Sequence, residues 1–124
     1  MSAPNIVNVA TITGKSAAVN LTGTTVLAVV SNPASSGKVF KVNSITVANV
    51  DGSVSADITI NYYSQDNVEG TATELAKTIP VPADSTVVII DKNISIYLEE
   101  DKSIGAIASA GNDLKVFCSY EEIS

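Results

Sequence analysis

The chain has 124 residues, of which 45% are hydrophobic and 16% charged, and its net charge is −6. A chain of this length is the size of one domain and needs no disulfide or metal ion to fold. It contains no His, Arg or Trp, and its seven cations are scattered lysines. Phosphate recognition favours Arg forks and basic stripes, so we expect neither nucleic acid nor an anionic membrane as partner.

The N-terminal sequence MSAPNIVNVA lacks the basic and continuously apolar regions of a secretion signal. We therefore expect no signal peptide and synthesis in the cytoplasm. The longest apolar runs, residues 26–30 and 87–90, are far shorter than a membrane span.

Residues 1–13 are apolar without a clear period. Ile6, Val7, Val9 and Ile12 do not share one strand face. This pattern predicts either an edge strand or an arm that docks on a neighbouring subunit, and the sequence leaves both open. These four residues are our candidate partner-binding residues, and residues 14–124 are predicted to form a single β-sandwich domain.

Gly14-Lys15-Ser16 matches the end of a phosphate-binding P-loop. The motif needs a further glycine five positions earlier, where this chain has Val9, and no helical pattern follows. We interpret the segment as a turn between two strands and expect no nucleotide cofactor.

Alternation of apolar and polar residues dominates the rest of the chain and predicts strands with one face on a core. The residues predicted to face inward are Ala56, Ile58, Ile60 and Tyr62, then Ile94, Ile96 and Leu98, and finally Leu114, Val116, Cys118 and Tyr120. Phe117 is an exception, because it is apolar on a polar face. Runs 26–30 and 87–90 are apolar on both faces and predict central strands or strands covered by a neighbour.

Residues 39–50 change phase, since Phe40 and Val42 are even-numbered whereas Ile45 and Val47 are odd-numbered. A one-residue insertion restores the face of a strand, so we predict a β-bulge near Asn43 and Ser44.

Turn-forming residues recur about every ten positions, including Asp51-Gly52 and Gly111-Asn112-Asp113. Eight or nine short strands at this spacing predict an all-β fold, an antiparallel two-sheet sandwich or jelly roll.

Residues with catalytic or ligand-binding potential are few. Cys118 has no histidine to activate it and is predicted to be an inert core thiol. The acidic groups at 99–101 and 121–122 are typical of solvated turns and termini, so we expect no enzyme activity and no metal site. Tyr63 and Tyr97 are predicted to be exposed and are candidate contacts for a partner or a carbohydrate.

The C-terminal half carries four motifs: VPADST at 81–86, IYLEEDKSI at 96–104, ASAGNDL at 108–114 and SYEEI at 119–123. Together with VFKVNSITVANVDG at 39–52, this pattern resembles small virion proteins of tailed bacteriophages, cyanophages especially. The resemblance covers about 85 residues, from Val39 to the end.

The resemblance implies a non-enzymatic virion structural protein without a cofactor, foremost a capsid decoration (cement) protein on the outer surface of the head. A neck, collar or tail-associated subunit is the alternative in the same class, and a carbohydrate-binding module is the alternative in another class. The implied partners are the major capsid protein or another virion protein, and further copies of the chain as a homo-oligomer, expected to be a trimer. The implied location is the virion, after synthesis in the host cytoplasm.

Overall fold

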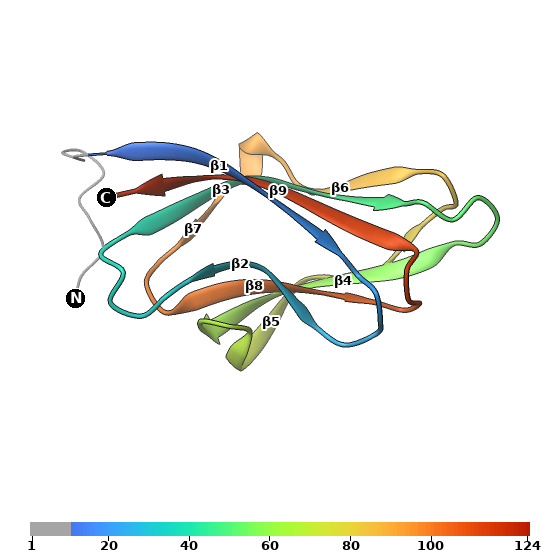
Figure 1. Ribbon diagram of the computed structural model, residues 1–124, viewed down its shortest axis with the longest axis horizontal. Helices are drawn as coiled ribbons and strands as arrows, with labels where there is room; N and C mark the ends of the chain where they lie inside the picture. The colour runs from blue at the N-terminus through green and yellow to red at the C-terminus, as the bar shows by residue number, and fades with distance from the viewer. Residues whose placement is uncertain (1–10) are drawn as a thin grey trace.

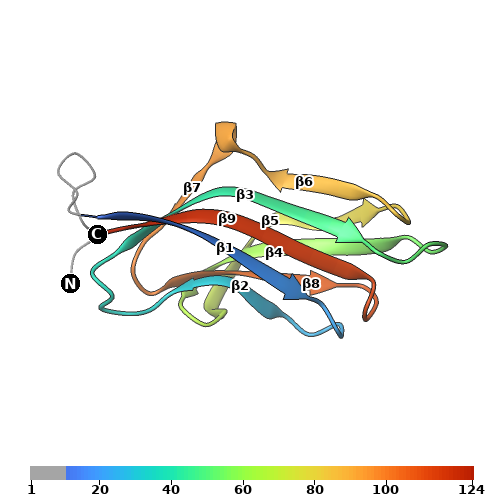
Figure 2. The ribbon, with the colours of Figure 1, turned by 45° about the horizontal axis from the view of Figure 1, so that its top comes forward.

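Nine strands pair into two antiparallel sheets in the computed structural model, which describes residues 11–124. The first sheet, called sheet A, contains β1 (Ile12–Asn20), β9 (Leu114–Ile123), β3 (Val39–Asn49) and β6 (Thr86–Ile90) in spatial order, with β7 (Ile96–Leu98) also paired to β3. The second, sheet B, contains β2 (Leu27–Asn32), β8 (Lys102–Ala108), β4 (Ala56–Gln65) and β5 (Glu69–Val81). Figures 1 and 2 show the sheets as two facing layers. The predicted two-sheet, all-β sandwich is confirmed.

The core lies between the sheets and is filled by the alternating residues. Ile58, Ile60, Leu98, Val116 and Cys118 are all fully buried or nearly so. Their polar neighbours point outward, because successive side chains of a strand face opposite sides.

The N-terminal end of the second predicted apolar series, Ile94, Ile96 and Leu98, departs from the pattern. Ile96 is only partly buried, and Ile94 is exposed. Ile94 ends a short 3₁₀ helix, Lys92–Ile94, so it does not belong to the strand. Its assignment to an inward face was wrong, because Asp91 caps this turn by accepting a hydrogen bond from the Asn93 backbone N–H at 2.9 Å.

The predicted β-bulge is present in β3. Val42 pairs with Tyr120 and Ser44 with Ser119, so Asn43 is the extra residue. After this bulge Ile45 faces the core, as Val42 does before it.

The two runs that are apolar on both faces form edge strands. Residues 27–30 lie in β2 at the edge of sheet B, and residues 87–90 lie in β6 at the edge of sheet A. The prediction of central strands was wrong for both. Val26, which precedes β2, lies with Val68 of the β4–β5 turn over Gly105, whereas Leu27 of the same run is 38% exposed.

Buried asparagine side chains hold the loops at the two ends of the sandwich. Asn32 donates from its amide to the carbonyls of Lys38 at 2.9 Å and Leu98 at 3.0 Å. Asn49 donates to the carbonyls of Val54 at 3.0 Å and Val81 at 2.9 Å. Because each amide replaces ladder bonds that the loops cannot make, the backbone groups there stay satisfied.

Candidate functional site

Tyr63, a predicted contact residue, is buried with only 7% of its surface exposed. It lies on the outer face of sheet B, opposite to the core side of β4, as its odd position predicted. The β4–β5 turn folds back over this face (Figure 1), and Val68 of the turn lies beside Tyr63 above Gly105. The expectation that Tyr63 is exposed was therefore wrong, because the adjoining β4–β5 turn covers it.

Hydrogen bonds to β8 and β2 fix the folded-back turn. The Ser103 hydroxyl donates to the Gln65 carbonyl at 2.7 Å and accepts from the Val68 N–H at 2.8 Å. The Ser31 hydroxyl accepts from the Asn67 N–H at 2.9 Å. Val68 has a φ of +54°, which is strained for a β-branched residue, and its N–H is held in this conformation by the Ser103 hydroxyl.

Tyr97 is exposed, as predicted, and lies on β7 beside Lys41 of β3. It belongs to sheet A, whereas Tyr63 belongs to sheet B. The structure does not bring the two tyrosines together, so they do not form a shared stacking platform for a sugar.

The N-terminal candidates are described only in part. Ile6, Val7 and Val9 lie outside the described residues. Ile12 is exposed and begins β1, where it pairs with Ile123 of β9.

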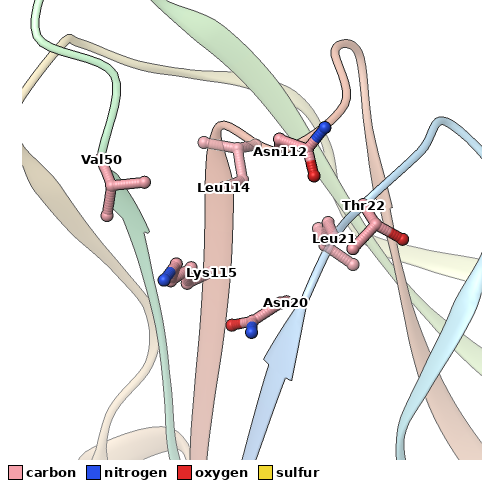
Figure 3. A pocket seen from close by; sticks show the side chains of 7 residues that line it. All are labelled: Asn20, Leu21, Thr22, Val50, Asn112, Leu114 and Lys115. Atoms are coloured by element: carbon pink, nitrogen blue, oxygen red, sulfur yellow. The ribbon is translucent and has the colours of Figure 1, made fainter.

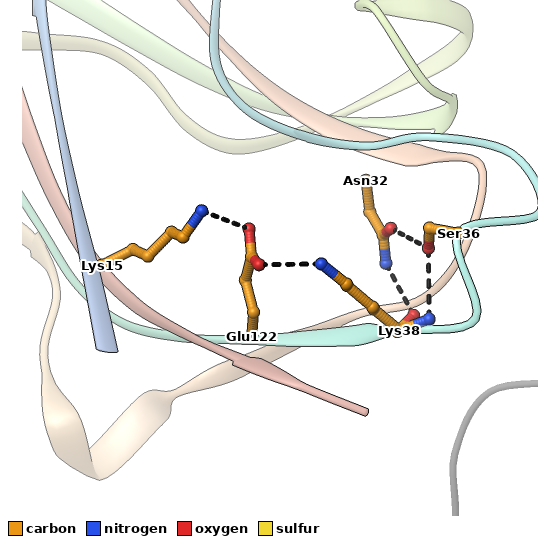
Figure 4. A network of polar contacts seen from close by, with 5 residues as sticks. All are labelled: Lys15, Asn32, Ser36, Lys38 and Glu122. Atoms are coloured by element: carbon orange, nitrogen blue, oxygen red, sulfur yellow. Dashed lines mark hydrogen bonds and ion pairs between the residues drawn. The ribbon is translucent and has the colours of Figure 1, made fainter. Parts of the chain in front are cut away.

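Gly14-Lys15-Ser16 lies within β1, so its interpretation as a turn was wrong. The Lys15 ammonium is 3.4 Å from a carboxylate oxygen of Glu122, and the Lys38 ammonium is 3.1 Å from the other oxygen (Figure 4). Glu122 is paired with two lysines, and this ion-pair cluster joins β1, β9 and the start of β3.

Acidic side chains of the turn at residues 99–101 accept hydrogen bonds from the backbone of neighbouring loops. A Glu100 carboxylate oxygen accepts from the Gly37 N–H at 3.1 Å, and an Asp101 oxygen accepts from the Asp66 N–H at 3.1 Å. Within residues 11–124, no group of three potential metal ligands gathers.

Cys118 is fully buried, and burial raises the pKa of its thiol to about 12. The thiol therefore stays protonated at neutral pH, which agrees with the predicted inert core residue.

A shallow pocket of about 220 Å³ lies at the end of the sandwich where the β1–β2, β3–β4 and β8–β9 connections meet (Figure 3). Its lining mixes amides, a hydroxyl and an ammonium with aliphatic side chains, namely Asn20, Leu21, Thr22, Val50, Asn112, Leu114 and Lys115. The lining contains no acidic side chain and no cysteine, so no general base lies beside the Thr22 hydroxyl or the Lys115 ammonium.

The outer face of sheet A carries a cross-strand row of three apolar residues and one threonine, and the sequence pattern did not reveal this row. Ala18, Phe117, Thr46 and Val88 are cross-strand neighbours on β1, β9, β3 and β6. Phe117 is 48% exposed and Val88 is 60% exposed. We call these four residues the apolar row. In the sequence, Phe117 is an apolar residue on a strand face that is otherwise polar, and this exception was the one indication of an exposed apolar surface here.

Comparisons with known proteins bear on the fold. No protein-family model matches the sequence, and no curated protein is significantly similar to it. A solved structure of Bacillus endospore appendages, described as a novel family of disulfide-linked pili, aligns with 92% of this chain and 88% of its own. The TM-score is 0.53 and the sequence identity is 19%, so the similarity concerns the fold alone.

Among residues 11–124, no helix has the length and apolar character needed to cross a membrane.

Proposed function

We propose that this chain is a non-enzymatic structural protein of a tailed-phage virion, which binds the exterior of the capsid as a decoration protein. The observation that carries the proposal is the apolar row across the outer face of sheet A. Phe117 and Val88 are large exposed apolar side chains on one face of sheet A, separated by Thr46 of β3, and exposed apolar surface of this kind marks places that other proteins cover.

The virion assignment rests on the resemblance of the segment from Val39 to the C-terminus to small phage virion proteins. The neck, collar or tail-associated role is the alternative within that class. The fold shared with a pilus protein supports the coarser part of the proposal, a subunit in a large protein assembly.

The chemistry of such an assembly differs from the disulfide linkage named for the pili. Cys118 is the single cysteine of the chain, and it is fully buried. A disulfide between subunits would require the core to open, so we propose non-covalent contacts.

The test is binding of purified protein to virions that lack it, measured by co-sedimentation. Val88→Asp places a charge in the apolar row and should weaken binding by roughly tenfold or more, since a buried valine contributes about 1.5–3 kcal/mol. Val54→Asp is the matched control, because Val54 is 56% exposed in the β3–β4 loop, away from the row.

We expect the wild-type protein and Val54→Asp to bind the heads, and Val88→Asp to lose binding. If the wild-type protein does not bind the virions, the proposal is wrong. If Val88→Asp binds as well as the wild type, the apolar row is not the surface that contacts the capsid. Binding confined to the neck or tail supports the alternative role.

A further inference from the structure

The free edge of β1 differs from the other edges of the sandwich. Edge strands expose unpaired backbone groups, and proteins usually protect them with bulges, prolines or charges. β5 has three irregularities in its ladder and contains Pro80, together with the charged residues Glu69, Glu74 and Lys77. β2 and β6 each have one irregularity.

Within residues 11–124, no strand pairs with the second edge of β1, and this strand has neither a bulge nor a proline. Its nine residues pair with β9 without any shift of register. It contains no proline, and its one charge, Lys15, is paired with Glu122.

The hydrogen bonds at both ends of this ladder show which groups are free. Thr11 and Ser124 exchange both backbone bonds, at 3.1 and 2.9 Å, and the Leu21 N–H donates to the Leu114 carbonyl at 3.0 Å. Bonded pairs alternate along an antiparallel ladder, so the odd residues of β1 bond to β9. The even residues direct their N–H and C=O groups away from β9, and these are Ile12, Gly14, Ser16, Ala18 and Asn20.

We propose that β1 is a self-association edge that pairs antiparallel with β1 of a second copy of this chain. With the two-fold axis at Ser16, each free residue meets another free residue: Ile12 opposes Asn20, Gly14 opposes Ala18 and Ser16 opposes itself. The five N–H and five C=O groups of each copy then form ten hydrogen bonds, and sheet A continues from one copy into the next.

The side chains of β1 fit this register. Gly14, Ser16 and Ala18 are small, so they leave room at the centre of the interface. Lys15 opposes Ala17 rather than the other Lys15, and its charge is already balanced by Glu122. The strand is thus self-complementary in bulk and charge, which is why a second copy is the partner that we propose.

Proline substitutions in β1 distinguish an effect on dimerisation from an effect on the stability of the fold. Ser16→Pro removes an N–H that faces away from β9, so it should leave stability in urea nearly unchanged and weaken dimerisation by roughly tenfold or more. Ala17→Pro is the matched control, because the Ala17 N–H belongs to the β9 ladder and its loss should destabilise the fold.

Sedimentation velocity at high protein concentration measures the association, and a cysteine cross-link checks the register. Opposed Ser16 residues would have Cα atoms about 5.5 Å apart, within the range of a disulfide. Ser16→Cys should therefore form a covalent dimer on mild oxidation, and Thr73→Cys on exposed β5 should not.

A wild-type monomer, a wild-type trimer, a Ser16→Pro protein that still dimerises, or a Ser16→Cys protein that does not cross-link would each overturn the pairing. The trimer that the resemblance implies would need a different, heterologous contact. Failure here is distinct from failure of the virion proposal, because capsid binding is measured separately through Val88.

Discussion

Gly105 lies in the middle of β8, where a methyl group has no room. A Cβ at this position would lie 2.6 Å from Val68 Cγ1, 2.9 Å from Val26 Cγ2 and 3.1 Å from Tyr63 Cε2. Alanine in a strand is normally more stable than glycine by about 0.5–1 kcal/mol, whereas an extra methyl in a packed site costs about 1–3 kcal/mol. Because Val68 is held by the Ser103 hydroxyl, we expect the packing cost to dominate and Gly105→Ala to lose about 1–2 kcal/mol of unfolding free energy.

Urea unfolding followed by far-ultraviolet circular dichroism measures this loss. Gly14→Ala is the control, because nothing lies within 4 Å of its added Cβ, and it should not be destabilised. Val68→Ala removes the nearest obstacle, so the double variant with Gly105→Ala should be more stable than the two single effects predict, by about 0.5–2 kcal/mol. A Gly105→Ala protein as stable as wild type, or no coupling with Val68→Ala, would refute the packing of the β4–β5 turn over sheet B.

Three further outcomes test the core and the loops. Ile60→Ala should cost about 2–5 kcal/mol of unfolding free energy, because Ile60 is fully buried; a loss under 1 kcal/mol would contradict its place in the core. The Cys118 thiol should resist a thiol reagent at pH 8 in the native protein and react in urea, and rapid native reaction would show that the core opens there. Asp51 accepts hydrogen bonds from the Ser53 and Val54 N–H groups, which lower its pKa below 3.8 in the folded state. The stability that the Asp51 carboxylate contributes is therefore present above pH 3.8 and is lost as the pH falls through the lowered pKa of the folded state. Asp51→Asn should remove this part of the acid dependence of the unfolding free energy. An unchanged dependence of that free energy on pH would contradict the role of Asp51.

The sequence predicted the fold where local periodicity determines it. The alternation of Ile58 and Ile60 placed both residues in the core, and the change of phase after Val42 predicted the bulge at Asn43. Residues adjacent in the sequence determine these features, because the side chains of a strand alternate between its two faces with a period of two residues.

The errors concern contacts and strand pairings that the period of a strand does not encode. Tyr63 has the phase of an exposed residue, but the turn that carries Val68 folds back over it, and no period in the sequence records that contact. Residues 87–90 were apolar enough for a central strand, yet the topology places them at an edge and leaves Val88 exposed. Periodicity gives the face of a strand, whereas its place in the sheet depends on long-range pairing.

The candidate site was predicted less well than the fold. Tyr97 is exposed as expected, but the structure separates it from Tyr63. The register of four strands was needed before Phe117 and Val88 could be placed in the same row across sheet A. The ion-pair cluster around Glu122 likewise joins Lys15 and Lys38, which are distant from it in sequence.

Low-resolution imaging of virions with and without the gene product tests the central claim most directly. The proposal predicts that virions containing the protein carry additional density at regular positions on the outer surface of the head, and that this density disappears when the protein is missing. Heads of identical appearance, or virions that contain no copies of the chain, would contradict a role as a capsid decoration protein.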